Sequence, residues 1–220
     1  MWHGVFEGGI RYLGGTLESY GNINTSDSLT AIKELVFDRK LITPGQLANA
    51  LDKNFAEQED IRRLLLLAPK YGNDDDEADR MAVRLHNDIC CMVREFNTKA
   101  GLHSYLAVII NNSMNTTFGL TTGASADGRL AYTYMANANN PMGGMDKSGI
   151  TAMLNSLVKL KTDEHAGSVQ NMRFSTEMFT KLLDKTKNLL EVYFSDGGSQ
   201  AMITVLSRGN LEEAMIMPEK

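Results

Sequence analysis

The feature that most constrains the fold of this chain is a long loop of small and turn-forming residues, which covers about residues 122–147. Asp127-Gly128 and Asn140-Pro141 are turn signals, so this part of the chain is predicted to be irregular. The loop leads directly into a segment with helical spacing. It follows a largely helical part of the chain and precedes an alternation of strands and helices.

The residues before the loop predict several helices. Ser26 or Asp27 can cap the first one and Thr43-Pro44 can open the second, because Ser, Thr and Asp side chains accept hydrogen bonds from the first N–H groups of a helix. Proline fits the first helical turn, where no backbone N–H is needed. The next two helices are expected at about residues 57–67 and 74–100, the latter beginning with four acidic residues.

The pattern changes after Gly101. Residues 104–110 are β-branched and aromatic and predict a buried strand, which residues 116–119 could extend. The glycine-rich opening stretch predicts a loop or a strand flanked by tight turns. The remaining elements are expected at 148–157 (helix), 168–173 (strand), 175–193 (helix), 200–206 (strand) and 210–215 (short helix).

These elements predict an α/β fold in one unit, residues 1–220. Its helical segment covers about residues 26–100, and its strand and helix segment covers about 101–220. With 220 residues, 43% of them hydrophobic, the chain can bury one sizeable core.

Composition excludes several classes of partner. A formal charge of −5 and a pI near 5.4 indicate no positively charged surface of the kind that binds nucleic acid or anionic membranes. No apolar run approaches the roughly 20 residues that a membrane helix needs, and the opening residues do not resemble a signal peptide. Two adjacent cysteines do not make a disulfide framework. A cytoplasmic location is expected.

The adjacent pair Cys90-Cys91 invites a catalytic reading. It lies in the middle of a predicted helix, where free cysteines usually behave as small hydrophobic residues. His86 and Cys90 share a helix face, but two ligands are too few for a zinc site. The sequence therefore predicts no metal ligand, and it nominates no catalytic base.

The order and spacing of several motifs resemble a known family. The loop and the helix after it, together with the DSL-AIK-LVF segment at residues 27–37 and the APKYGNDD segment at residues 68–75, are similar to the glycyl radical enzymes of the pyruvate formate-lyase type. The residues that carry the resemblance in the loop and the following helix are Gly123, Asp127-Gly128-Arg129, Asn140-Pro141-Met142, Gly144, Asp146, Gly149, Ala152, Leu154, Ser156 and Lys159-Leu160.

The resemblance implies a barrel of two half-barrels with outer helices, in which this chain supplies much of the second half-barrel. It also implies radical cleavage of a small organic substrate, of the formate acetyltransferase, dehydratase or lyase type. The family's catalytic cysteine loop precedes the region matched here, and its RVxGYS-like glycine loop follows it. Neither motif occurs in these residues, so no catalytic residue is assigned and the chain is expected to be inactive alone.

The resemblance also implies a substrate-pocket lining. In the family, the segment equivalent to residues 136–144 approaches the substrate chamber, so Asn139, Asn140, Pro141 and Met142 are candidates for lining it. Amide side chains can donate and accept hydrogen bonds to a substrate. The alternative is that this loop is a structural plug.

One departure from the family follows the Asp127-Gly128-Arg129 turn. Many members continue with small residues, whereas this chain has Tyr132 and Tyr134. The two tyrosines leave the path of the loop and its substrate preference open.

The implied cofactor is not expected in this chain itself. In the family, a glycyl radical is installed on the complete enzyme by an iron–sulfur activating enzyme that uses S-adenosylmethionine. Expected partners are the remainder of the enzyme or a radical-bearing subunit, the activating enzyme, and further copies in a homo-oligomer. Two alternatives stay open: a non-catalytic split subunit that docks with a separate radical-bearing polypeptide, and a scaffold or binding protein.

Overall fold

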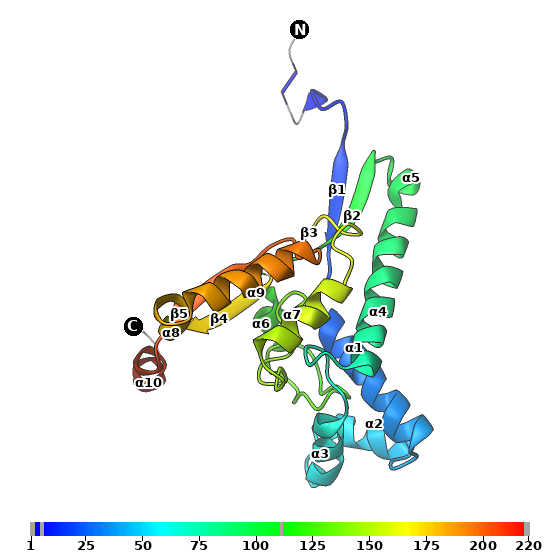
Figure 1. Cartoon of the computed structure of the whole chain (residues 1–220). Helices are drawn as coiled ribbons and strands as arrows, with labels where there is room; N and C mark the ends of the chain where they lie inside the picture. The colour runs from blue at the N-terminus through cyan, green and yellow to red at the C-terminus, as the bar shows by residue number, and fades with distance from the viewer. Residues whose placement is uncertain (1–2, 5–6, 111, 218–220) are drawn as a thin grey trace.

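The chain folds around two small parallel sheets (Figure 1). The computed structural model describes residues 3–4, 7–110 and 112–217. The first sheet has the strand order β1-β2-β3, and the second pairs β4 with β5. The strands are β1 (Gly14–Glu18), β2 (Ser104–Ile109), β3 (Gly167–Ser168), β4 (Asn171–Ser175) and β5 (Met202–Leu206). Parallel pairing requires long crossovers, which the helices provide.

The helices lie in the connections between the strands, except α10, which follows β5. Between β1 and β2 lie α1 (Asn22–Ile32), the π-helical segment η2 (Lys33–Asp38), α2 (Pro44–Asp52), α3 (Glu59–Leu67), α4 (Asp76–Glu95) and α5 (Asn97–Ala100). After β2 come α6 (Met114–Gly119), α7 (Ile150–Lys159), α8 (Thr176–Thr180), α9 (Leu183–Ser195) and α10 (Arg208–Ile216). The α/β class expected from the sequence is thereby confirmed.

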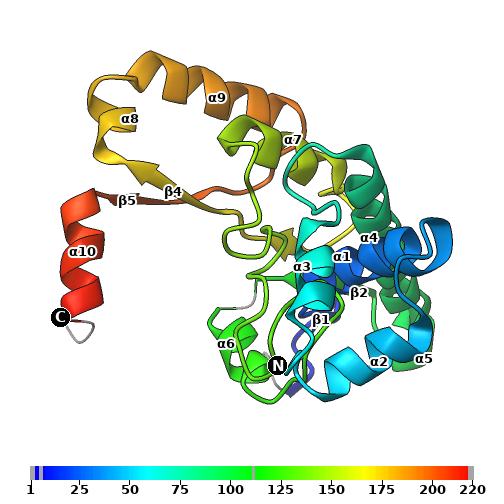
Figure 2. The same cartoon turned by 90° about the horizontal axis from the view of Figure 1, so that it is seen from below.

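The molecule consists of a body and an arm. In the body, the long helix α4 packs along β2 and against α1. The arm is made of β4, β5, α8 and α9, and Figure 2 shows it projecting from the body with α10 at its far end. A cluster of buried side chains, among them Leu157, Phe174 and Tyr193, joins α7 to the arm. A second cluster, among them Leu35, Phe55 and Leu65, holds α1 to α3 together.

Two helix starts expected from the sequence are confirmed, at Thr43-Pro44 and at the acidic residues before α4, and both are capped. At α2, the Thr43 hydroxyl accepts a hydrogen bond from Gln46 N (3.2 Å), and Gln46 Oε1 accepts one from Thr43 N (2.8 Å). At α4, Asp75 Oδ1 accepts from the backbone N–H groups of Glu77 (3.0 Å) and Ala78 (3.2 Å). These hydrogen bonds satisfy N–H groups that have no partner inside the helix.

The predicted cap of the first helix is wrong. Helix α1 begins after Gly21, whose left-handed backbone (φ 72°) turns the chain into the helix. Ser26 and Asp27 lie inside the helix and are buried. The Ser26 hydroxyl donates to Ile23 O (3.0 Å), while Asp27 accepts a hydrogen bond from another segment. Their side chains therefore serve buried contacts rather than the helix end.

The region after β2 is also corrected. Residues 116–119 do not extend the strand but belong to helix α6. Asn112 (φ 42°) and Ser113 (φ 80°) adopt left-handed backbone conformations that turn the chain away from the sheet. Asn115 then fixes the helix by donating from its amide to Met135 O (3.1 Å).

Two later predictions merged elements that the structure separates. The strand expected at residues 168–173 is split between β3 and β4, which belong to different sheets. The helix expected at residues 175–193 is broken, because the N–H groups of Lys181 and Leu182 both donate to Glu177 O (2.8 and 3.0 Å) and close the end of α8. No proline or glycine marks this break, so periodicity alone could not reveal it.

Candidate functional site

Helix α1 lies beneath the long loop and binds it at two points. The side-chain amide of Asn24 in α1 donates to Asp127 Oδ2 (2.6 Å), and the side-chain carbonyl oxygen of Asn24 accepts from Ala136 N (2.7 Å). All three residues are buried. The loop is therefore held from below by helix α1, and its course does not depend on local turn preferences alone.

The Asp127-Gly128-Arg129 turn is fixed by its own side chains. Asp127 Oδ1 accepts from the Ser125 hydroxyl (2.6 Å) and from Arg129 N (3.2 Å). The Arg129 guanidinium donates to the carbonyl oxygens of Leu130 (3.1 Å), Thr133 (2.9 Å) and Gly123. Arginine carries five donors in a planar group, and here it connects three backbone carbonyl groups between residues 123 and 133.

Asp27 is the most deeply buried charged group beneath the loop, with no solvent exposure. Its Oδ1 accepts from Tyr71 N (2.9 Å), whereas its Oδ2 has no hydrogen-bond partner among the residues that the structure describes. Burial raises the pKa of Asp27 to about 7, although the Tyr71 N–H group and the nearby Lys70 charge oppose the shift.

Lys70 is a buried cation next to Asp27. Its ammonium donates to Leu65 O (2.6 Å) and Ala68 O (3.1 Å), and so satisfies carbonyl groups at the end of α3. Burial lowers the pKa of Lys70, while the charges of Asp27 and Asp127 oppose that shift.

A pocket of about 220 Å³ opens beside these charged groups. It has five charged residues in its wall together with apolar side chains from α3 and from the loop. It is lined by Asp27, Arg62, Leu66, Lys70, Asp127, Gly128, Arg129, Leu130, Thr133, Tyr134, Met142, Gly143 and Met145.

The four residues predicted to line a substrate pocket occupy different environments. Asn139 is buried, and its amide nitrogen has no partner among the described residues. Asn140 donates to Asn171 O (2.8 Å) and accepts from Asn171 N (3.0 Å), so it binds the start of β4 as a neighbouring strand would. Met142 lines the pocket described above. A role in a substrate chamber stays a prediction for all four residues.

Pro141 lies against the backbone of the APKYGNDD segment. A β-carbon built on Gly72 would lie 2.4 Å from Pro141 Cγ, so the two segments are in closest contact where glycine has no side chain. Gly72 also has a left-handed backbone (φ 92°). This contact locks the middle of the long loop to the turn between α3 and α4.

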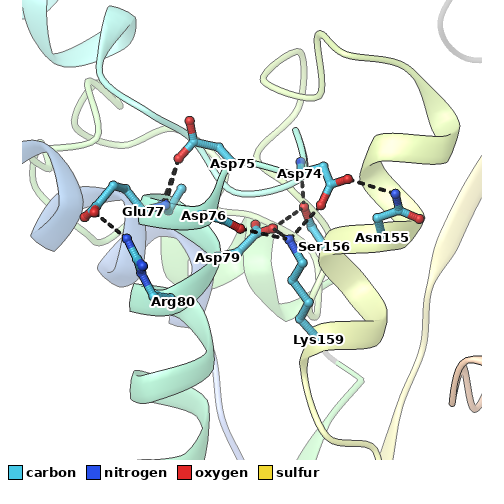
Figure 3. A network of polar contacts seen from close by, with 10 residues as sticks. Asp74, Asp75, Asp76, Glu77, Asp79, Arg80, Asn155, Ser156 and Lys159 are labelled. Atoms are coloured by element: carbon cyan, nitrogen blue, oxygen red, sulfur yellow. Dashed lines mark hydrogen bonds and ion pairs between the residues drawn. The ribbon is translucent and has the colours of Figure 1, made fainter.

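A second polar network joins the start of α4 to α7 (Figure 3). Lys159 donates to Asp74 Oδ1 and to Asp79 Oδ2, both at 2.6 Å. Ser156 donates to Asp79 Oδ2 (3.0 Å) and accepts from Asp74 N (3.0 Å). Burial raises the pKa of Asp79, and the contacts with Lys159 and Ser156 oppose this rise. The network positions the helix that follows the loop.

Sequence reasoning used several of these residues only as family markers. Asp27, Lys70 and Asp127 belong to the motifs named above, but no joint role was inferred for them, and Asn24 was missed. The one available signal for Asn24 and Asp27 was their polarity within a largely buried helix, because buried polar groups almost always serve a hydrogen bond.

The cysteine pair lies on α4, as predicted. Cys90 is buried and Cys91 exposed. The Cys90 sulfur lies 3.7 Å from His86 Nε2, and His165 packs its ring edge-on against His86 with centroids 5.2 Å apart. Within the part of the chain that the structure describes, no group of three or more His, Cys, Asp or Glu side chains is placed to hold a metal ion.

Because His165 is buried, we expect the chain to lose stability in acid. Burial, with a contribution from His86, lowers its pKa from 6.5 to about 4, so the folded chain favours the neutral ring. Above pH 6.5 the ring is neutral in both the folded and the unfolded chain, and His165 does not change the stability with pH. As the pH falls from 6.5 towards 4, the unfolded chain binds a proton that the folded chain does not, so the folded chain becomes less stable. By pH 5 we expect the free energy of unfolding to fall by about 2 kcal/mol from this group. Urea unfolding at pH 7.5 and 5.0 measures it.

The variant His165→Phe should lose this part of the pH dependence, while a matched His3→Gln variant at an exposed position should keep it. An unchanged pH profile in His165→Phe would contradict the assignment. The comparison uses the difference between two pH values, so a constant packing cost of the phenylalanine cancels.

Comparison with known proteins gives consistent matches along the chain. A family model described as pyruvate formate lyase-like matches residues 2–119, and one described as glycine radical matches residues 135–220. Trans-4-hydroxy-L-proline dehydratase of Clostridioides difficile is 34% identical over 215 residues, which are 96% of this chain and 27% of that protein. Isethionate sulfite-lyase of Bilophila wadsworthia (strain 3_1_6) is 37% identical over 140 residues, 64% of this chain and 17% of the relative.

A solved structure shows the same fold. A structure from Roseburia inulinivorans described for 1,2-propanediol dehydration superimposes on this chain with a TM-score of 0.90 and 35% sequence identity. The match covers 97% of this chain and 28% of the Roseburia chain. The chain thus spans about a quarter of the length of the dehydratases that it matches along nearly all of its residues. No helix in the described ranges is long and apolar enough to cross a membrane.

Proposed function

This chain belongs to the glycyl radical enzyme family, and on that premise we propose that it forms part of the wall of a radical enzyme that cleaves a small organic substrate. Dehydration or a related lyase reaction is the favoured class, because the chain matches a trans-4-hydroxy-L-proline dehydratase and a structure described for 1,2-propanediol dehydration along nearly all of its residues. The proposal rests mainly on one observation. Both family models that match the chain belong to this type of enzyme, and the chain has the fold of the Roseburia inulinivorans structure at a TM-score of 0.90.

The open sheet edges support a role as one part of a larger barrel. Strands at the edge of a sheet present unpaired backbone groups that can accept a further strand. β4 and β5 form a sheet of only two strands, and β5 exposes Met202 and Val205. Apolar side chains of α10, among them Met215 and Ile216, are also exposed. We propose that further barrel strands cover this surface, and that homo-oligomers form through it when they are absent.

Within this proposal, the loop at residues 136–144 forms one side of the substrate chamber. Asn139 has a buried amide nitrogen without a described partner, so it is the best placed of the four candidates to donate to a substrate. Asn140 and Pro141 hold the loop in position through Asn171 and Gly72. No residue of this chain is assigned to the radical or to its generation.

The proposed partners follow from the same premise. An activating enzyme that carries an iron–sulfur cluster and uses S-adenosylmethionine would install the glycyl radical on the complete assembly, and the reaction would take place in the cytoplasm. A closed chamber that excludes solvent is what such a radical requires. The chain's own contribution is to build and order part of that chamber.

A domain exchange tests the proposed function. Residues 1–220 replace the matching segment of trans-4-hydroxy-L-proline dehydratase, and the chimera and the isolated chain are each incubated anaerobically with the activating enzyme and S-adenosylmethionine. We expect a glycyl radical doublet in the electron paramagnetic resonance spectrum of the chimera and none from the isolated chain. A doublet from the isolated chain would refute the proposal.

The same experiment separates the alternative function. A non-catalytic split subunit or scaffold would yield a chimera that is folded by circular dichroism and runs at the correct size, yet never acquires the radical. A chimera that carries the radical but does not dehydrate the proline substrate would keep the family role and locate the substrate preference in this chain.

A further inference from the structure

Asn24 contacts both ends of the loop segment that carries the candidate substrate-chamber residues. Its side-chain carbonyl oxygen accepts from Ala136 N (2.7 Å), and its side-chain amide donates weakly to the Met142 sulfur (3.6 Å). The same amide donates to Asp127 Oδ2 (2.6 Å). No more than 5% of Asn24, Ala136 or Asp127 is exposed. One buried side chain therefore binds three points of the long loop.

The face of α1 that carries Asn24 is held by further contacts. Residues three and four apart share one face of a helix, so Asn24, Asp27 and Ser28 point in similar directions. The Ser28 hydroxyl accepts from Asp127 N (3.0 Å), which fixes the turn that Asn24 also binds. Asp27 accepts from Tyr71 N (2.9 Å) in the segment between α3 and α4. The helix thus presents Asn24 from a fixed position.

The loop between the two contact points contains a strained residue beside Asn139. Ala138 has a left-handed backbone (φ 51°), which costs free energy in a residue with a β-carbon and persists only where surrounding contacts impose it. The Asn140 N–H group donates to Asn137 O (2.9 Å) and closes the turn around Ala138. Asn139 is buried, and its amide nitrogen has no partner among the described residues. Its direction therefore depends on how the two ends of the loop are held.

We propose that Asn24 is a positioning residue that orients Asn139 towards the substrate of the complete enzyme. This inference rests on the proposed function, in which residues 136–144 form one side of the substrate chamber. Without the Asn24 side chain, Ala136 N and Asp127 Oδ2 lose their buried partner, and the strained turn between the contact points can relax. Substrate binding then weakens, because small displacements of a positioning group carry a large cost. The radical itself is not affected.

The first test measures kinetics in the chimera with trans-4-hydroxy-L-proline dehydratase. Asn24→Ala is expected to keep the radical yield within about twofold of the parent chimera and to raise the KM for trans-4-hydroxy-L-proline about tenfold, with a smaller change in kcat. A residue that only stabilises the fold would lower the yield of radical and the apparent kcat and leave KM unchanged. The matched control is Asn49→Ala, at an exposed position of α2, which should keep the KM of the parent.

A double variant tests the hydrogen bond itself. Asn24→Asp combined with Asp127→Asn exchanges donor and acceptor at constant charge and nearly constant shape, and the carboxylate at position 24 can still accept from Ala136 N. We expect Asn24→Asp alone to raise KM, because it places two carboxylates side by side in a buried site. The double variant should recover most of the parent KM. A folded double variant that recovers none of it would overturn the role of this hydrogen bond.

Amide hydrogen exchange of the isolated chain gives a second measurement that does not depend on activity. Asn24→Ala should speed the exchange of Ala136 N–H at least about tenfold and leave the protection of strand β2 unchanged. Circular dichroism establishes that each variant is folded. Unchanged exchange at Ala136 would overturn the inference, and so would an unchanged KM in the Asn24→Ala chimera. A parent chimera without a radical would instead refute the proposed function, and the inference would fall with it.

Discussion

Gly72→Ala is expected to destabilise the chain by about 3–5 kcal/mol, because two separate costs add. The backbone of Gly72 is left-handed (φ 92°), a conformation that a residue with a β-carbon adopts at a cost. The new methyl group would also lie 2.4 Å from Pro141 Cγ and 2.7 Å from Pro141 Cβ. Pro141 is a buried ring without flexible torsions, so the two segments must move apart.

The measurement is urea unfolding of the chain followed by circular dichroism. Gly144→Ala is the matched control, since Gly144 is also left-handed (φ 78°) but a β-carbon added to it would meet no atom within 4 Å. It should lose only the backbone contribution, about 1–2 kcal/mol. Equal losses in the two variants would show that the contact with Pro141 does not hold the loop.

Lys159→Met is expected to cost about 3 kcal/mol at pH 7, because it removes the cation that neutralises the buried Asp79 carboxylate. The Asp79 side chain is only 2% exposed, and Lys159 contacts it at 2.6 Å. Methionine preserves the length and apolar packing of the lysine stem, so the loss reports mainly on the charge. Asp74, at the turn before α4, loses its ion pair in the same variant.

Two further observations identify the cause of that loss. Lys159→Met combined with Asp79→Asn should recover much of the stability, because it removes the uncompensated carboxylate. The loss should also shrink as the pH falls towards 4, since burial already raises the pKa of Asp79 and protonation neutralises it. The control Lys187→Met breaks the exposed ion pair with Glu191 and should cost less than about 1 kcal/mol. Similar losses at Lys159 and Lys187 would show that burial of the Asp79 carboxylate does not cause the loss.

Features with local causes were predictable from the sequence. Thr43 followed by proline and then Gln46 specifies a capping box within four residues, and the acidic residues before α4 specify its start. The strand at residues 104–110 was found from its composition and differs from β2 by one residue. The order of the family motifs also identified the fold, because it summarises the whole chain rather than any one element.

The misplaced elements share a tertiary cause. Ser26 and Asp27 have the chemistry of helix caps, but α1 places them where buried groups need hydrogen bonds to Ile23 and Tyr71. The break between α8 and α9 carries no helix-breaking residue, and Thr186 donates across it to Met178 O (2.7 Å). Intrinsic preferences of a few tenths to about one kcal/mol are readily outweighed by such contacts.

By itself the sequence determined the class of fold, most helix starts, the family and the loop at which function was sought. The tertiary structure alone decided which residues act together. Asn24 binds Asp127 and Ala136, which lie 103 and 112 positions away in the sequence. His165 packs against His86, and Pro141 packs against Gly72. The physical reason is that a hydrogen bond or a steric contact depends on distance in space. The degree of burial then determines how much the contact contributes to stability. Neither the distance in space nor the burial can be derived from spacing along the chain.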